Sequence, residues 1–158
     1  MKKFIQMYFD KKIVEDFAEH EQNEKNFIVA DIVDQIIMQT IWHIDKNFKA
    51  CELGGGAHPD RYHRLFEELI KNQVIIDRVD ISPYMLEIAK KYIDNDQYKA
   101  RLDVIQFIES DIISYLTEAS DNSLDLAIMK YTIDHIADID SLFGLLAKKL
   151  TPWWVLRF

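Results

Sequence analysis

The spacing of apolar residues changes near residue 47, and this change separates two kinds of predicted structure. Between residues 25 and 44 apolar pairs recur every four positions, which predicts one long amphipathic helix. Ile13, Phe17 and His20 indicate a shorter helix before it. We therefore expect an N-terminal helical cap over residues 1–46.

From residue 47 onward, compact apolar runs alternate with segments of helical periodicity. The predicted strands are 48–53, 76–81, 104–108, 124–129 and 153–158. The predicted helices are 62–70, 84–94, 112–118 and 138–150. Such alternation indicates βαβ units, so residues 47–158 are expected to form one compact α/β domain. Its core would be a Rossmann-like, doubly wound and mainly parallel sheet of about five strands with helices on both faces.

Two prolines mark expected helix boundaries. Ser82 is a favoured N-cap residue, and Pro83 suits the first position of the helix that follows it. Pro152 is expected to end the last helix, with Lys148 and Lys149 near the negative end of the helix dipole.

Composition narrows the functional classes. The 158 residues contain 19 Lys and Arg against 27 Asp and Glu, and a net charge of −8 disfavours a nucleic-acid partner. The single cysteine, Cys51, is expected to be a small core residue. No metal site is expected. One cysteine cannot form an internal disulfide, so a reducing, cytoplasmic location is expected. No apolar segment matches a signal peptide or a membrane span, so no contact with a membrane is expected.

The most informative stretch is the run from Cys51 through Glu52 and Leu53 to Gly54, Gly55 and Gly56, at the end of the first predicted strand. Glycines there let the backbone turn sharply and let a ligand approach it closely. A nicotinamide dinucleotide motif would need a third glycine where Pro59 stands. The carboxylate of Glu52 also suits a ligand with ammonium and sulfonium groups better than a pyrophosphate. S-adenosylmethionine is therefore favoured, and a dinucleotide-dependent oxidoreductase is a distant alternative.

Two further acidic residues follow the next two predicted strands. Asp80 ends the second strand, where a carboxylate can accept hydrogen bonds from both ribose hydroxyls. Asp111 follows the third strand, where it can accept from an adenine amine, although by itself it is better explained as a helix N-cap. Together with the glycines, these acids predict a ligand site at the carboxyl edge of the sheet.

With these motifs, the sequence resembles the class I S-adenosylmethionine-dependent methyltransferases over about residues 48–152. The first family motif is similar to CELGGG, the second to VDISPYMLEIAKKY and the third to ESDI. The fourth is similar to DNSLDLAIMKYTIDHIADIDSLFGLLAKKLTP. The resemblance implies a Rossmann-like fold and in-line methyl transfer from S-adenosylmethionine to a small-molecule acceptor.

The resemblance also implies roles for individual residues. The cofactor-binding residues would be Glu52, Gly54, Gly55, Gly56, Asp80, Ile81, Met85, Asp111, Ile112 and Lys130. The first four would cradle the methionine end, and Asp80 would hold the ribose. Ile81 and Met85 would flank the adenine, and Asp111 with Ile112 would bind its amine. Lys130 and Tyr131 would face the sulfonium and the acceptor. The candidate catalytic residues, Tyr131 and His135, would border the acceptor. His135 suits a general base, and a purely structural role is the alternative.

The chain departs from the family pattern near its end. Pro152, Trp153 and Trp154 stand where the family has Pro-Gly-Gly, and the sixth and seventh family strands are missing, so a C-terminal truncation is expected. A non-catalytic cofactor-binding module that acts through a partner protein is therefore the leading alternative. The apolar last strand at an open sheet edge also predicts a homodimer through that edge.

Overall fold

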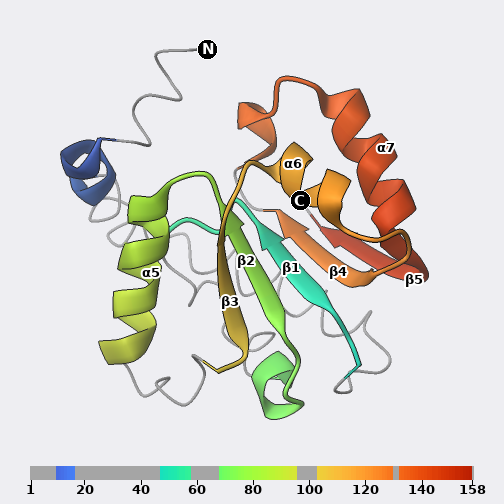
Figure 1. The fold of residues 1–158 in the computed structure, drawn as a ribbon, viewed down its shortest axis with the longest axis horizontal. Coiled ribbons are helices and arrows are strands. Elements are labelled where there is room, and N and C mark those ends of the chain that lie inside the picture. The colour runs from blue at the N-terminus through green and yellow to red at the C-terminus, as the bar shows by residue number, and fades with distance from the viewer. Residues whose placement is uncertain (1–9, 17–46, 58–67, 96–102, 130–131, 158) are drawn as a thin grey trace.

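The computed structural model of the chain describes residues 10–16, 47–57, 68–95, 103–129 and 132–157. Within these residues five strands form one parallel sheet (Figure 1). The strands are β1 (Ala50–Leu53), β2 (Ile76–Asp80), β3 (Ile105–Glu109), β4 (Leu124–Met129) and β5 (Leu150–Arg157). The predicted α/β, Rossmann-like class is confirmed.

The helices connect and cover these strands. They are α5 (Pro83–Asn95), α6 (Ile112–Glu118), α7 (Ile139–Lys149) and a short 3-10 helix, η3 (Ile133–His135). Residues 11–16 and 68–71 are helical as well. The predicted helix over residues 25–44 lies outside the described residues, as does most of the predicted helix over residues 62–70.

The strand order is β3-β2-β1-β4-β5, and every pair is parallel. From β1 the chain builds outward first through β2 and β3, and then on the other side through β4 and β5. The order therefore reverses between β1 and β4, and ligands of such sheets bind at the carboxyl ends of the strands beside this reversal. Leu53 lies opposite Val79 on one side and Met129 on the other, so three strands end at the same level.

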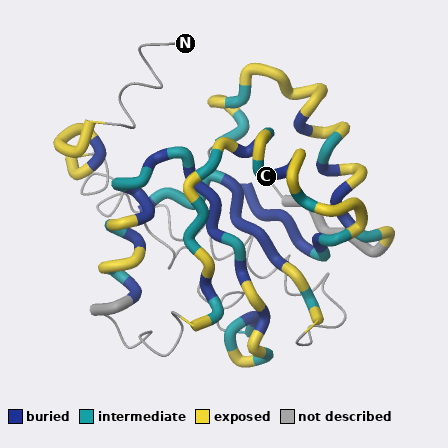
Figure 2. The backbone as a smooth tube through the Cα atoms, in the orientation of Figure 1, coloured by how far each residue is buried: buried dark blue, intermediate teal, exposed yellow. Residues whose placement is uncertain are grey.

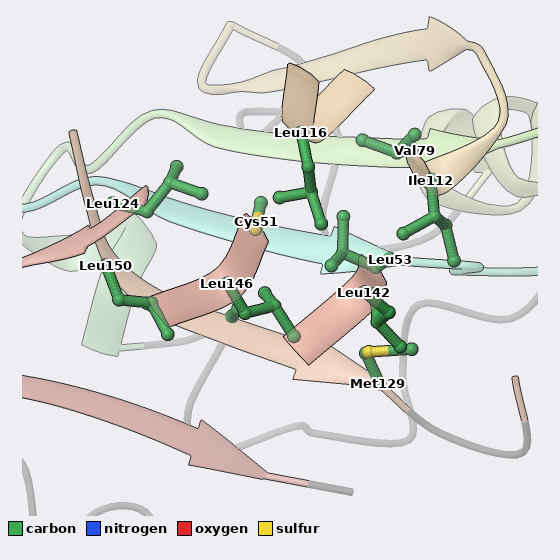
Figure 3. Close-up of a cluster of buried hydrophobic side chains, with 11 residues drawn as sticks. Cys51, Leu53, Val79, Ile112, Leu116, Leu124, Met129, Leu142, Leu146 and Leu150 are labelled. Atoms are coloured by element: carbon green, nitrogen blue, oxygen red, sulfur yellow. The ribbon is translucent and has the colours of Figure 1, made fainter. Parts of the chain in front are cut away.

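Helices α6 and α7 cover one face of the sheet. Leu116 of α6 and Leu142 and Leu146 of α7 pack with Cys51 and Leu53 of β1 (Figure 3). Because alternate strand residues point to opposite faces, a second cluster forms on the other side. It contains Ala50, Leu69, Val74, Ile76, Ile93, Ile105, Leu126 and Ile128. The sheet is thus buried on both faces while the outer surfaces of α6 and α7 stay exposed (Figure 2).

The start of α5 agrees with the prediction. Pro83 is its first residue, and the Ser82 Oγ accepts a hydrogen bond from the Met85 backbone N–H at 3.4 Å. Ser82 is therefore the N-cap, and it is fully buried at the carboxyl edge of the sheet.

The end of α7 differs from the prediction. The helix ends at Lys149, and Leu150 is both its C-cap and the first residue of β5, so Pro152 lies inside a strand. The Ser123 backbone N–H donates to the Lys149 carbonyl at 2.8 Å, so a tertiary hydrogen bond helps to end the helix before the proline. Proline is tolerated in β5 because β5 is an edge strand of this sheet. A homodimer through this edge stays a prediction.

Aspartates are the N-cap residues of α6 and α7, the two helices that cover one face of the sheet. Asp111 Oδ1 accepts from the Ser114 N–H and Asp138 Oδ1 accepts from the Ser141 N–H, each at 2.9 Å. The hydrogen bonds from Ser114 and Ser141 lower the pKa of the two carboxyls. Both caps therefore stabilise the folded chain in their ionised form.

The lowered pKa values predict a dependence of stability on acid pH. Stabilisation by the two caps is complete above the ordinary aspartate pKa of about 3.9 and is lost as the pH falls through the lower folded values. Asparagine caps helices equally well and does not titrate. We expect the double variant Asp111→Asn/Asp138→Asn to lose less stability than the natural chain between pH 5 and 2. Urea unfolding followed by circular dichroism at each pH measures this loss. Equal losses of stability in the variant and the natural chain would contradict the prediction.

Candidate functional site

A glycine turn follows β1 at the reversal of the strand order. Gly54 and Gly56 have φ values of +72° and +61°, in the left-handed region that favours glycine. The backbone N–H groups of Gly54 and Gly55 both donate to the Val79 carbonyl, at 2.8 and 3.2 Å. The turn is therefore tied to the end of β2.

Thr132 lies against this turn from the loop that follows β4. A Cβ on Gly54 would lie 2.4 Å from both Cγ2 and Oγ1 of Thr132. The Thr132 hydroxyl donates to the Gly54 carbonyl at 3.3 Å. Thr132 therefore occupies the space on the Cβ side of Gly54, and the close approach of a ligand to this turn stays a prediction. The sequence gives Thr132 no distinguishing motif, because only the fold brings it to β1.

Glu52 and Arg78 form a buried ion pair beneath the turn. They are direct partners in the register of β1 and β2, so their side chains share one face of the sheet. The Arg78 side chain is fully buried and that of Glu52 is 6% exposed. Arg78 Nη1 donates to Glu52 Oε2, while Nη2 donates to the Gly55 carbonyl and, at 2.9 Å, to the Gly56 carbonyl. Sequence reasoning missed Arg78, although a charged residue inside a buried parallel strand was a usable indication.

Asp80 joins the turn to the start of α5. Its Oδ2 accepts from the Gly56 N–H at 2.9 Å and its Oδ1 accepts from the Ser82 N–H at 2.8 Å. Asp80 is 8% exposed, and burial raises the pKa of its carboxyl, an effect partly offset by Ser82, Gly56 and Arg78. A carboxylate offers about four lone-pair sites, so both oxygens keep acceptor capacity for a ligand.

Two predicted cofactor residues are covered by other parts of the chain. Met85 is 3% exposed and packs with Ala57 and with Val14 of the N-terminal helical segment. Ile112 is 7% exposed and belongs to the cluster under α6 and α7 (Figure 3). Ile81, the residue between Asp80 and the α5 cap, is half-buried. Residues 11–16 therefore lie beside α5 at the same edge as the glycine turn (Figure 1).

The remaining predicted residues lie farther from the turn or outside the description. Asp111 is exposed and is the N-cap of α6, the role that its position alone suggested. His135 is exposed and ends η3, and its backbone N–H donates to the Thr132 carbonyl at 3.0 Å. Lys130 and Tyr131 lie outside the described residues.

Cys51 does not contribute a nucleophile to this site. It is fully buried, and burial, followed by the charges of Asp77 and Glu52, raises the pKa of its thiol.

Among the residues described, no group of three His, Cys, Asp or Glu side chains is arranged to hold a metal ion. In the same part of the chain, every helix is too short or too polar to span a bilayer.

Known proteins are similar to this chain in family and in fold. A family model described as a methyltransferase domain matches residues 52–153, well over half of the chain. A Methanococcus maripaludis structure, described as an S-adenosyl-L-methionine-dependent methyltransferase, is similar with a TM-score of 0.68 and 23% identity. That match covers 90% of this chain and 60% of the other, so the chain spans less than two thirds of that protein. Among curated proteins none matches.

Two further structures agree in fold. A methyltransferase dependent on S-adenosylmethionine from Aquifex aeolicus has a TM-score of 0.62 at 14% identity, covering 91% of this chain and 69% of that one. Phosphoethanolamine N-methyltransferase 2 of Haemonchus contortus, in complex with S-adenosyl-L-methionine, has a TM-score of 0.57 at 22% identity, covering 75% and 25%. The family match and the shared Rossmann-like sheet lead to one conclusion: the chain belongs to the methyltransferase domain family, as its four sequence motifs implied.

Proposed function

We propose that the chain binds S-adenosylmethionine and catalyses methyl transfer to a small-molecule acceptor. The observation that carries this proposal is Asp80, a buried carboxylate at the end of β2 whose two oxygens each hold one backbone N–H and can accept another bond. Ribose hydroxyls are suitable donors for such an acceptor. The family match over residues 52–153 supports the same assignment.

The residues present fit the nucleoside part of this cofactor. Asp80 would hold the ribose, and the positive φ values of Gly54 and Gly56 keep the turn compact beside it. Gly55, Ile81, Met85, Asp111, Ile112 and Lys130 complete the proposed binding set, whereas Glu52 supports the turn through its pairing with Arg78. When bound, S-adenosylmethionine supplies an electrophilic methyl group on its sulfonium. The chain's own contribution is to bind and orient the two reactants, because an in-line displacement depends mainly on their positioning.

A small-molecule acceptor is supported by the Haemonchus contortus relative, whose name gives phosphoethanolamine as its substrate. The proposed catalytic residues beside the acceptor are Tyr131 and His135, which is exposed on η3 after β4.

The second candidate function is a non-catalytic cofactor-binding module. It is favoured by the ion pair of Glu52 with Arg78, which occupies the carboxylate proposed for the methionine end. A cytoplasmic location stays a prediction.

Removal of the Asp80 carboxylate tests the binding site. Asp80→Ala is expected to weaken S-adenosylhomocysteine binding at least tenfold, since charge-assisted hydrogen bonds contribute about 1.5–3 kcal/mol. Isothermal titration calorimetry measures the affinity, and circular dichroism checks that the variant is folded. Asp103→Ala is the matched control, because it removes an exposed carboxylate just before β3, at the opposite edge of the sheet. Unchanged affinity in Asp80→Ala excludes Asp80 from the site, and a natural chain that does not bind the ligand overturns the proposed function.

A methyl-transfer screen with labelled S-adenosylmethionine then distinguishes the two candidates. Transfer to any small amine, thiol or hydroxyl compound supports the enzyme. Cofactor binding without transfer supports the module.

A further inference from the structure

The acceptors best suited to a cationic ligand group at the glycine turn are already in use. They are the Glu52 carboxylate and the carbonyls of Gly55 and Gly56. All three receive hydrogen bonds from the guanidinium of Arg78, which is fully buried. An internal cation thus stands where the charge of Glu52 would attract an ammonium group.

The arrangement is built into the strand register. Glu52 and Arg78 are opposite each other on β1 and β2, so the guanidinium reaches the carboxylate without leaving the sheet face. A Cβ on Gly55 would lie 2.9 Å from Arg78 Cγ and 3.0 Å from its Cζ. The absence of a side chain at Gly55 is therefore what allows the turn to close over Arg78.

One cation excludes a second at this position. A guanidinium and an ammonium carry the same charge and compete for the same acceptors, so a ligand ammonium gains little from Glu52 while Arg78 remains there. The Arg78 Nε has no hydrogen-bond partner among the described residues, although it is buried. The guanidinium is therefore held through its two terminal nitrogens, which are the nitrogens that an ammonium would have to replace.

We propose that Arg78 is a specificity-determining residue that closes the ammonium subsite of the cofactor pocket. This inference rests on the proposed function. In the natural chain the nucleoside part provides most of the affinity, and the amino-acid end of the cofactor adds little. The site then accepts adenine thioethers that lack an amino-acid end about as well as it accepts S-adenosylhomocysteine.

The test compares two ligands that differ in the amino-acid end, S-adenosylhomocysteine and 5′-methylthioadenosine, by titration calorimetry. The quantity measured is the Kd of the second ligand divided by that of the first. In the natural chain this ratio is expected to be within about threefold of one, since a factor of three is a small fraction of a single ionic hydrogen bond. Arg78→Met removes the cation at similar length, and the ratio is expected to rise at least tenfold because no internal cation then neutralises the charge of Glu52.

Two further variants separate the charge effect from a change in fold. Glu52→Gln/Arg78→Met leaves neither charge, and its ratio is expected to return to that of the natural chain. Glu52→Gln alone keeps an acceptor for Arg78, and its ratio is expected to stay unchanged because Glu52 does not contact the ligand. This single variant keeps the proposal testable where Arg78→Met is too unstable to titrate.

A ratio that falls tenfold in Glu52→Gln, or that stays the same in a folded Arg78→Met variant, overturns the assignment of Arg78 while the proposed function stands. Failure of both ligands to bind the natural chain overturns the proposed function and this inference with it.

Discussion

Gly54→Ala is expected to destabilise the folded chain by about 2–5 kcal/mol, from a left-handed backbone conformation that alanine disfavours and from overpacking. The structural cause is the pair of contacts of 2.4 Å that an added Cβ would make with Thr132. Urea unfolding measured by circular dichroism gives the change. The natural control is Gly144 in α7, where an added Cβ meets nothing within 4 Å. Gly144→Ala is expected to stabilise the chain by about 0.5–1 kcal/mol, because alanine is the better helix former.

A second substitution separates the two causes at Gly54. Thr132→Gly removes the atoms that would collide, so Gly54→Ala introduced into that background is expected to cost only the backbone term of about 1–2 kcal/mol. An equal loss in both backgrounds would show that Thr132 does not limit this position.

Arg78→Met is expected to lower the free energy of unfolding by about 3–5 kcal/mol, because it removes the cation that neutralises the buried carboxylate of Glu52. The double variant Glu52→Leu/Arg78→Met removes both charges and is expected to recover most of this loss. The difference between the single and double variants, obtained from urea unfolding, measures the coupling between the two side chains.

An exposed ion pair supplies the control. Lys71 Nζ lies 3.3 Å from Glu68 Oε1, and the side chains of Lys71 and Glu68 are 72% and 38% exposed. Lys71→Met is expected to change stability by less than about 1 kcal/mol, since water screens such pairs. A loss at Lys71 as large as that at Arg78 would show that burial does not set the strength of the inner pair.

The fold was predictable because its determinants are local along the chain. Each buried parallel strand carries a short apolar run, as in Leu124–Met129, and each helix has its own period. The position of Asp80 was predictable for the same reason, since a carboxylate that ends a strand of a parallel sheet must lie at the carboxyl edge of that sheet. These features need no knowledge of which strands are neighbours.

The parts that were missed depend on contacts between distant residues. Arg78 meets Glu52 only because the register of β1 and β2 places them opposite each other. Thr132 reaches Gly54 only because β4 lies beside β1 in the sheet. The last helix was predicted to end at residue 150 with Pro152 as its stop, whereas it ends at Lys149, where a hydrogen bond from Ser123 acts before the proline. Periodicity and composition carry no information on such pairings.

The central place of β1 has a consequence for the order in which the chain folds. Its partner β4 is distant in sequence, and the Lys49 N–H that donates to Asp125 Oδ2 at 2.9 Å bridges 76 residues. Closing a loop of that length carries a larger entropy loss than joining β2 to β3 through α5. The β2-α5-β3 unit can therefore assemble before β1 is enclosed on its other side. The glycine turn, which lies between the two halves of the sheet, gains its contact with Thr132 only when the second half docks.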